Sequence, residues 1–207
     1  MIRIWGRTTS SNVMKVLWLL EELGVTYERV DAGGAFGRTN TPEYRAMNPE
    51  GLVPALEENG FSLFESNAIL RYIGNAYAPG SDWYPSAPRP RGEVDAWLDL
   101  QQTLLNAPHT TIFVGLIRTP PEQRDPAAIA AAAAQAGKVW TLVETKLGDQ
   151  NFLLGARPTI ADIAFGVHAH RWFSLPIDRP ALPKLRAWYD RLLTRPAYAT
   201  HCAQPLA

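Results

Sequence analysis

The feature that most constrains the fold is a change of sequence pattern at a proline-rich segment in the first half of the chain. Ala78–Arg91 holds four prolines and one glycine, residue types that interrupt helices and strands. Before this segment, short strand-like runs alternate with a run of helical apolar spacing. After it the spacing is helical almost throughout. The sequence therefore predicts a small α/β domain followed by an all-α domain.

The N-terminal part begins with a predicted strand–helix–strand unit. Ile2–Trp5 and Val25–Val30 read as short strands, and Val13–Leu23 between them carries apolar residues at helical intervals. Ser10, Ser11 and Asn12 are each able to cap the first turn of this helix. The order of these elements is that of a βαβ unit.

A predicted hairpin and a helix complete this part. Short strands at Val53–Glu57 and Ser62–Glu65 flank Asn59 and Gly60, the dipeptide that most strongly favours a tight hairpin turn. The segment Ser66–Tyr77 follows with its apolar residues on one helical face. We therefore assign residues 1–80 to the α/β domain, 81–91 to a linker and 92–207 to the helical domain.

The helical domain is predicted from four amphipathic or alanine-rich segments. They are Gly92–Asn106, Pro126–Leu147, Thr159–Phe173 and Leu182–Leu193. Thr159 and Asp162 have the spacing of an acidic capping box at the start of the third segment. We interpret Asp162 as a structural residue, with a catalytic carboxylate as the alternative.

Composition excludes several classes of function. The chain has 207 residues with 20 Lys+Arg against 20 Asp+Glu, so it lacks the basic surplus typical of nucleic-acid or anionic-membrane binding. Its single cysteine, Cys202, forms neither an intramolecular disulfide nor a cysteine zinc site. The longest apolar run, Val16–Leu20, is far shorter than the roughly 20 residues that span a bilayer. We expect a cytoplasmic protein without metal, nucleic-acid or membrane partners.

The loop Arg7–Asn12 is the first candidate for chemistry. It joins the first strand to the first helix, at the edge of the sheet where α/β proteins bind ligands. It offers four hydroxyl side chains, one amide and a helix N-terminus, and backbone N–H groups at such an end attract anions. It holds no histidine or carboxylate, so a serine-hydrolase mechanism lacks its base. Capping and turn formation are the structural alternative.

Two further short motifs suggest a bound peptide or amino acid. Pro54 follows Val53 at the start of a predicted strand, where an exposed backbone is able to pair with a peptide ligand. Ser66 is a natural helix N-cap beside Glu65. Together they would hold the carboxylate and ammonium groups of one amino acid.

Taken together, these segments resemble the soluble glutathione transferases over essentially the whole chain. The βαβ unit, Val53-Pro54 and the helix start Glu65–Ile69 are similar to the thioredoxin-like domain of that family. The segment Thr159–Asp162 is similar to its helical bundle domain. The resemblance implies that glutathione is the co-substrate, that no metal is needed, and that the thiol is activated as a thiolate for attack on a small hydrophobic electrophile.

The resemblance also implies roles for single residues. The expected catalytic residues are Ser10, of the serine-type classes, and Asn12, an assisting amide. The expected glutathione-binding residues are Ser11, Arg38, Asn40, Val53, Pro54 (a cis-proline), Glu65 and Ser66. Thr9 and Ser11 remain alternatives to Ser10 as the activating hydroxyl. The chain departs from the family pattern at Leu52, where many relatives carry Lys or Gln near the glycyl carboxylate; Arg38 or Asn40 would serve there.

The helical domain would carry the electrophile pocket. The aromatic residues and the imidazole proposed for it are Trp97, His109, Phe113, Trp172 and Phe173. The family also implies a homodimer through Glu65–Tyr77 and Gly92–Asn106, and a role in detoxification. Two alternatives remain at this stage: glutathione-dependent reduction of disulfides or peroxides, and a scaffold that binds glutathione without turnover.

Overall fold

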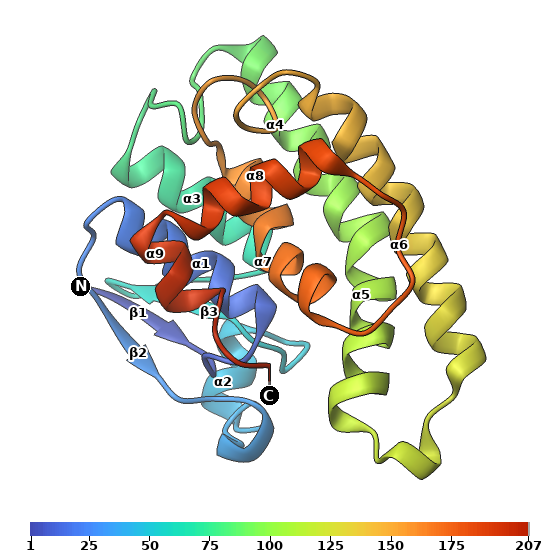
Figure 1. Ribbon diagram of the computed structural model, residues 1–207. Helices are drawn as coiled ribbons and strands as arrows, with labels where there is room; N and C mark the ends of the chain where they lie inside the picture. The colour runs from blue at the N-terminus through green and yellow to red at the C-terminus, as the bar shows by residue number, and fades with distance from the viewer. Residues whose placement is uncertain (207) are drawn as a thin grey trace.

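The computed structural model describes residues 1–206, which form a small sheet with flanking helices and a larger helical part (Figure 1). The strands run in the order β2-β1-β3-β4. Pairing of β1 with β2 is parallel, whereas β3 is antiparallel to both β1 and β4. The N-terminal elements are β1 (Ile2–Trp5), α1 (Ser11–Glu22), β2 (Tyr27–Val30), η1 (Gly34–Phe36), α2 (Pro42–Met47), β3 (Ala55–Glu58), β4 (Phe61–Phe64) and α3 (Ser66–Tyr77).

The hairpin turn explains how β3 and β4 pair. Asn59 and Gly60 both have positive φ angles, 50° and 82°, as a two-residue turn of the mirror-image type requires. Glu58 therefore lies opposite Phe61 in the register. The hairpin continues directly into α3, which brings Ser66 beside the first turn of α1.

The C-terminal part is all helical, as the sequence predicts. Its elements are α4 (Pro88–Leu100), η2 (Gln101–Leu105), α5 (Asn106–Phe113), η3 (Val114–Arg118), η4 (Pro121–Gln123), α6 (Pro126–Leu147), α7 (Ile160–Ser174), α8 (Pro183–Leu193) and α9 (Pro196–His201). Figure 1 shows α5 and α6 as a long antiparallel pair, with α7 inside the bundle. Burial agrees with this position, because twelve of the fifteen residues of α7 are buried.

One continuous hydrophobic core joins the two parts. Trp18 of α1 is fully buried and meets Tyr198 of α9 edge to face, with ring centroids 4.8 Å apart. Gly166 of α7 lies against the same indole, where a side chain larger than hydrogen would collide. The helical part is therefore packed directly on the first helix, and this fixes the β1–α1 loop relative to α5 and α7.

Two predicted boundaries are corrected by the structure. The helix expected over Gly92–Asn106 instead begins at Pro88, inside the expected linker, because proline is well suited to the first turn of a helix. It gives way at Gln101 to the wider turns of η2. The strand expected at Val53 begins at Ala55, after the cis Val53–Pro54 peptide bond. The domain boundaries given above stay predictions, and Ala207 lies outside the described residues.

Candidate active site

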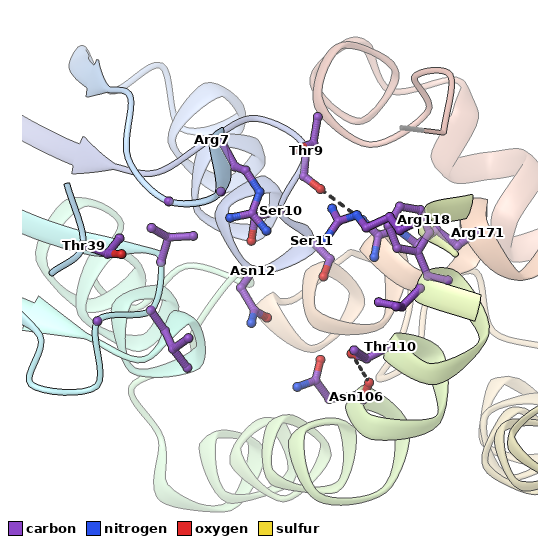
Figure 2. A pocket seen from close by; sticks show the side chains of 17 residues that line it. Arg7, Thr9, Ser10, Ser11, Asn12, Thr39, Asn106, Thr110, Arg118 and Arg171 are labelled. Atoms are coloured by element: carbon purple, nitrogen blue, oxygen red, sulfur yellow. Dashed lines mark hydrogen bonds between the residues drawn. The ribbon is translucent and has the colours of Figure 1, made fainter. Parts of the chain in front are cut away.

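A cavity of about 350 Å³ opens where the β1–α1 loop meets α5, η3 and α7 (Figure 2). The residues that line it come from loops of the sheet part and from helices of the bundle. They are Arg7, Thr9, Ser10, Ser11, Asn12, Gly33, Gly34, Thr39, Gly51, Leu52, Val53, Asn106, Thr110, Phe113, Val114, Arg118 and Arg171.

Three of the four hydroxyl-bearing residues of the β1–α1 loop line this cavity. Ser10 is the N-cap of α1 by its backbone, since its carbonyl oxygen accepts from Met14 N at 2.9 Å. Its side chain makes no capping hydrogen bond, which leaves the hydroxyl free to bind a ligand. Thr9 and Ser11 also line the cavity. The loop is held from the bundle side, because Arg171 Nη2 donates to the Thr9 carbonyl oxygen at 3.2 Å.

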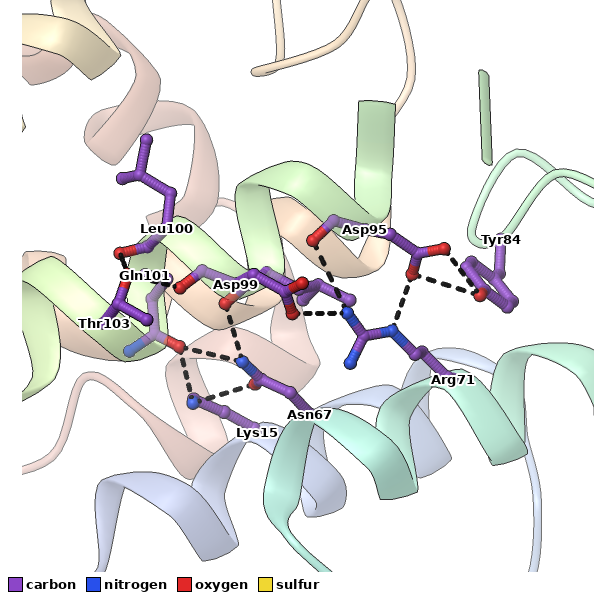
Figure 3. Close-up of polar contacts among 10 residues, drawn as sticks. Lys15, Asn67, Arg71, Tyr84, Asp95, Asp99, Leu100, Gln101 and Thr103 are labelled. Carbon is purple, nitrogen blue, oxygen red and sulfur yellow. Dashed lines mark hydrogen bonds and ion pairs between the residues drawn. The ribbon is translucent and has the colours of Figure 1, made fainter. Parts of the chain in front are cut away.

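Asn12 is connected to a buried polar network. Ser66 Oγ donates to Asn12 Oδ1 at 3.3 Å, and Lys15 Nζ donates to Ser66 Oγ at the same distance. The ammonium group of Lys15 also donates to Asn67 Oδ1 at 3.0 Å and to Gln101 Oε1 at 2.9 Å (Figure 3). The predicted amide of Asn12 and the predicted glutathione-binding Ser66 are therefore hydrogen-bonded to each other, and the buried Lys15 holds Ser66.

Lys15 itself was not predicted as a site residue. Its side chain is fully buried, and this burial lowers the pKa of its ammonium group to about 7, against an opposing effect of the Glu65 carboxylate. A helical apolar face that carries one lysine is the only sequence signal for such a residue. Glu65, which has a φ of 68°, ends the hairpin and starts α3.

The segment around Leu52 is fixed through its backbone. The Leu52 carbonyl oxygen accepts from Tyr44 Oη at 2.6 Å and from Asn48 Nδ2 at 2.8 Å. The Leu52 side chain is 61% exposed. The cis Val53–Pro54 bond follows, and Val53 lines the cavity. This places an ordered backbone segment next to the hydroxyl loop.

The two residues expected to serve the glycyl carboxylate in place of a basic residue at position 52 do not line the cavity. Neither Arg38 nor Asn40 is among the lining residues, whereas Thr39 between them is. Asn40 Oδ1 instead accepts from Arg45 Nη2 at 2.7 Å. Pro54, Glu65 and Ser66 likewise lie outside the set of lining residues.

Of the five residues expected in the electrophile pocket, Phe113 alone lines the cavity. Trp172 and His109 are buried in the bundle core, where Trp140 Nε1 donates to His109 Nε2 at 2.9 Å. Burial also lowers the pKa of His109 to about 3. The remaining two belong to packed aromatic pairs: Trp97 packs against Phe165 and Phe173 against Tyr189. These four side chains lie in the hydrophobic core or pack against it, as large aromatic side chains commonly do.

Three arginine residues that the sequence did not indicate as site residues line the cavity. Arg7 follows β1, Arg118 ends η3, and Arg171 lies in the last turns of α7. Arg171 lies over the ring of Phe113 at 3.8 Å and Arg118 at 5.0 Å. The three arginines are far apart in the sequence, so no local motif predicts that they lie together.

Comparison with known proteins decides the family. The family model for the glutathione S-transferase N-terminal domain matches residues 1–75, and the one for the C-terminal domain matches residues 126–191. The chain belongs to the glutathione S-transferase family. It is 41% identical over 200 residues to the glutathione S-transferase GstB of Escherichia coli strain K12, and the match covers 95% of each chain. A maize (Zea mays) relative, glutathione S-transferase 3, is 30% identical over 99% of this chain and 95% of its own.

Solved structures support the same assignment. The theta class glutathione S-transferase from Xanthomonas axonopodis pv. citri, with glutathione bound, superimposes with a TM-score of 0.94 at 45% identity. That comparison covers 100% of this chain and 99% of the other. This glutathione S-transferase accordingly has the thioredoxin-like and helical domains of the family, and it is a transferase that uses glutathione.

Two further properties of residues 1–206 concern metal binding and membrane insertion. No cluster of three or more His, Cys, Asp or Glu side chains is arranged to hold a metal ion among them. No helix in this part of the chain is long and apolar enough to cross a membrane.

Proposed function

We propose that Ser10 activates bound glutathione by donating a hydrogen bond to its thiolate, which then attacks a small electrophile. The observation that carries this proposal is the position of Ser10. Its hydroxyl lies at the N-terminus of α1, lines the cavity, and is not used to cap the helix. A free hydroxyl and a positive helix end at one point both favour a negatively charged sulfur.

The energies are sufficient without a general base. A thiol with a pKa near 8.5 is only a few per cent ionised at neutral pH. Lowering that pKa by two units requires about 2.7 kcal/mol of preferential stabilisation of the thiolate. A hydrogen bond to a charged group contributes about 1.5–3 kcal/mol, and a helix N-terminus adds about 0.3–1 kcal/mol.

The other predicted residues orient glutathione in the same proposal. The backbone of Val53 pairs with the cysteinyl unit, next to the hydroxyl loop. The γ-glutamyl head group lies at the start of α3, with its ammonium group at Glu65 and its carboxylate at Ser66. Support for the last point comes from Lys15, whose ammonium group lies 3.3 Å behind the Ser66 hydroxyl and adds positive potential there.

The test is a titration with reduced glutathione followed by ultraviolet difference absorbance of the thiolate. Ser10→Ala is expected to raise the pKa of the bound thiol by about one to two units, the effect of one charge-assisted hydrogen bond. Ser11→Ala is the matched control, since it removes a neighbouring hydroxyl that also lines the cavity. A thiolate signal that survives in Ser10→Ala and disappears in Ser11→Ala would transfer the role to Ser11.

A homodimer and a cytoplasmic location complete the proposal. Helices α3 and α4 are joined by Arg71, whose guanidinium group binds Asp95 at 2.6 Å and Asp99 at 2.8 Å (Figure 3). These ion pairs hold the two helices as one surface, which we propose as the dimer interface. Light scattering after size exclusion checks it, because a monomer mass would contradict it. Glutathione is kept reduced in the cytoplasm, which supports that location.

A further inference from the structure

The cavity carries a concentration of positive charge that the overall composition does not suggest. The whole chain has a formal net charge of zero, yet Arg7, Arg118 and Arg171 all line this one cavity. Arg118 and Arg171 lie against the same aromatic ring, that of Phe113. The aromatic face therefore sets two guanidinium groups on one wall of the cavity.

These charges are not neutralised by neighbouring carboxylates. Within residues 1–206, no Asp or Glu side chain lies within ion-pair distance of any of the three. Desolvation, together with repulsion by Arg118 and Arg7, lowers the pKa of Arg171 to about 10. Desolvation and Arg118 likewise lower the pKa of Arg7. Arg171 is buried, whereas Arg7 is half-buried and Arg118 is exposed. A buried charge such as that of Arg171 is costly unless an opposite charge joins it.

Arg118 and Arg171 lie on the electrophile side of the proposed thiol position, whereas the Arg7 side chain lies against Gly33 and Gly34. Figure 2 shows Thr39 on one side of the cavity and Arg118 with Arg171 on the other, with Ser10 and Ser11 between them. The peptide of glutathione is assigned to the first side, next to the segment that includes Val53. A second substrate in line with the thiolate therefore meets Arg118 and Arg171.

We propose that Arg118 and Arg171 form a subsite for the carboxylate of an anionic electrophile. This inference rests on the proposed function and specifies its substrate class as small electrophiles that carry a carboxylate. Guanidinium groups match the planar geometry of a carboxylate and bind it with paired hydrogen bonds. The positive field also attracts such a substrate to the cavity.

The chemical step is a substitution at carbon. For an aryl chloride, the glutathione sulfur forms a bond with the ring carbon that bears chlorine, and the carbon–chlorine bond breaks with its electron pair going to chloride. The proton of the thiol has already passed to solvent when the thiolate formed. No atom is oxidised or reduced, and the substrate carboxylate is unchanged at the arginines.

The experiment uses two aryl chlorides that differ at one group, a charged carboxylate in 4-chloro-3-nitrobenzoate and a neutral carboxamide in 4-chloro-3-nitrobenzamide. For each, kcat/KM is divided by the uncatalysed rate constant with glutathione, which corrects for intrinsic reactivity. The unaltered enzyme is expected to favour the carboxylate by about tenfold or more, the effect of one hydrogen bond between charged groups. In Arg118→Gln this preference is expected to fall about tenfold. Arg89→Gln, an exposed arginine on α4, is the control for net charge.

The outcomes separate this inference from the proposed function. Turnover of both compounds without preference for the carboxylate overturns the subsite and leaves the transferase mechanism intact. An equal loss with both compounds in Arg118→Gln, together with weaker glutathione binding, assigns the arginine to glutathione itself and also overturns the subsite. If neither compound reacts, the proposed function fails in this assay, and binding decides the subsite.

Binding is measured with 3-nitrobenzoate and 3-nitrobenzamide, which have no leaving group. Isothermal titration of the glutathione-bound enzyme is expected to show the carboxylate binding about tenfold more tightly than the amide, and this difference is expected to vanish in Arg118→Gln. Equal affinity of the two compounds for the unaltered enzyme contradicts the proposal.

Discussion

Lys15 Nζ lies 3.3 Å from Ser66 Oγ, and this contact joins the interior of the protein to the proposed binding site for the γ-glutamyl group. Lys15 is fully buried on α1 and Ser66 opens α3. The same ammonium group donates to Gln101, whose Nε2 lies 3.1 Å from His168 Nε2. One buried amine thereby connects both domains at the site.

The first prediction concerns the pH dependence of stability. The pKa of Lys15 is about 7 in the folded protein and 10.5 as a free side chain. Between these values the unfolded chain binds the proton more strongly, so the free energy of unfolding is expected to rise with pH, by at most about 1.4 kcal/mol per unit. Urea unfolding at several pH values across this window measures it.

The variant Lys15→Met is expected to remove that rise, because it deletes the titrating group. Lys138→Met is the control, since Lys138 is an exposed lysine on α6. The explanation fails if Lys15→Met keeps the pH slope of the unaltered protein.

The second prediction concerns the capping box of α7. Asp162 is fully buried and accepts from Leu153 N and Thr159 N, both at 2.8 Å, and from Trp188 Nε1 at 3.0 Å. Asp162→Ala leaves these buried donors without an acceptor and is expected to cost about 3 kcal/mol of unfolding free energy. Asp125→Ala is the comparison. It removes one exposed cap of α6, the bond to Ala128 N at 2.9 Å, and is expected to cost about 1 kcal/mol. Equal losses in urea unfolding would show that burial does not matter here.

The third prediction concerns the close packing of α7 on α1. A Cβ atom at Gly166 would lie 2.7 Å from Cζ3 of Trp18. Gly166→Ala is expected to destabilise the protein by about 2 kcal/mol, because the buried indole has no free space to move into. Gly92→Ala on α4 meets no atom within 4 Å and is expected to stabilise by about 0.5–1 kcal/mol through helix propensity. Thermal unfolding of both variants checks the contrast, and a stabilised Gly166→Ala would refute it.

Local signals predicted the elements whose hydrogen bonds stay within a few residues. The helix predicted over Pro126–Leu147 has those same bounds in the structure. The capping box of Thr159 and Asp162 forms with both of its hydrogen bonds. Asn59 and Gly60 make the hairpin turn. Each of these features depends on residue types and spacing alone, which a sequence displays directly.

Contacts between residues far apart in the sequence gave some segments a structure or a role that local residue spacing does not predict. The helix predicted through Asn106 gives way at Gln101 to a wider turn, and there the buried Gln101 side chain accepts from Lys15. Trp172 shows the same limit for the site. Its aromatic character suits a binding pocket and a core equally, and only the packing around α7 shows that it belongs to the core.

The sequence by itself determined the order of the domains, the hydroxyl loop with Ser10, and the motifs at Val53-Pro54 and Ser66. Tertiary structure alone decided that Arg7, Arg118 and Arg171 meet at one cavity. The physical reason is that a local motif depends on neighbours along the chain, whereas the field in a cavity depends on distance in space. Residues from a loop and two helices become neighbours only when α7 and the α5–η3 region pack against the first helix.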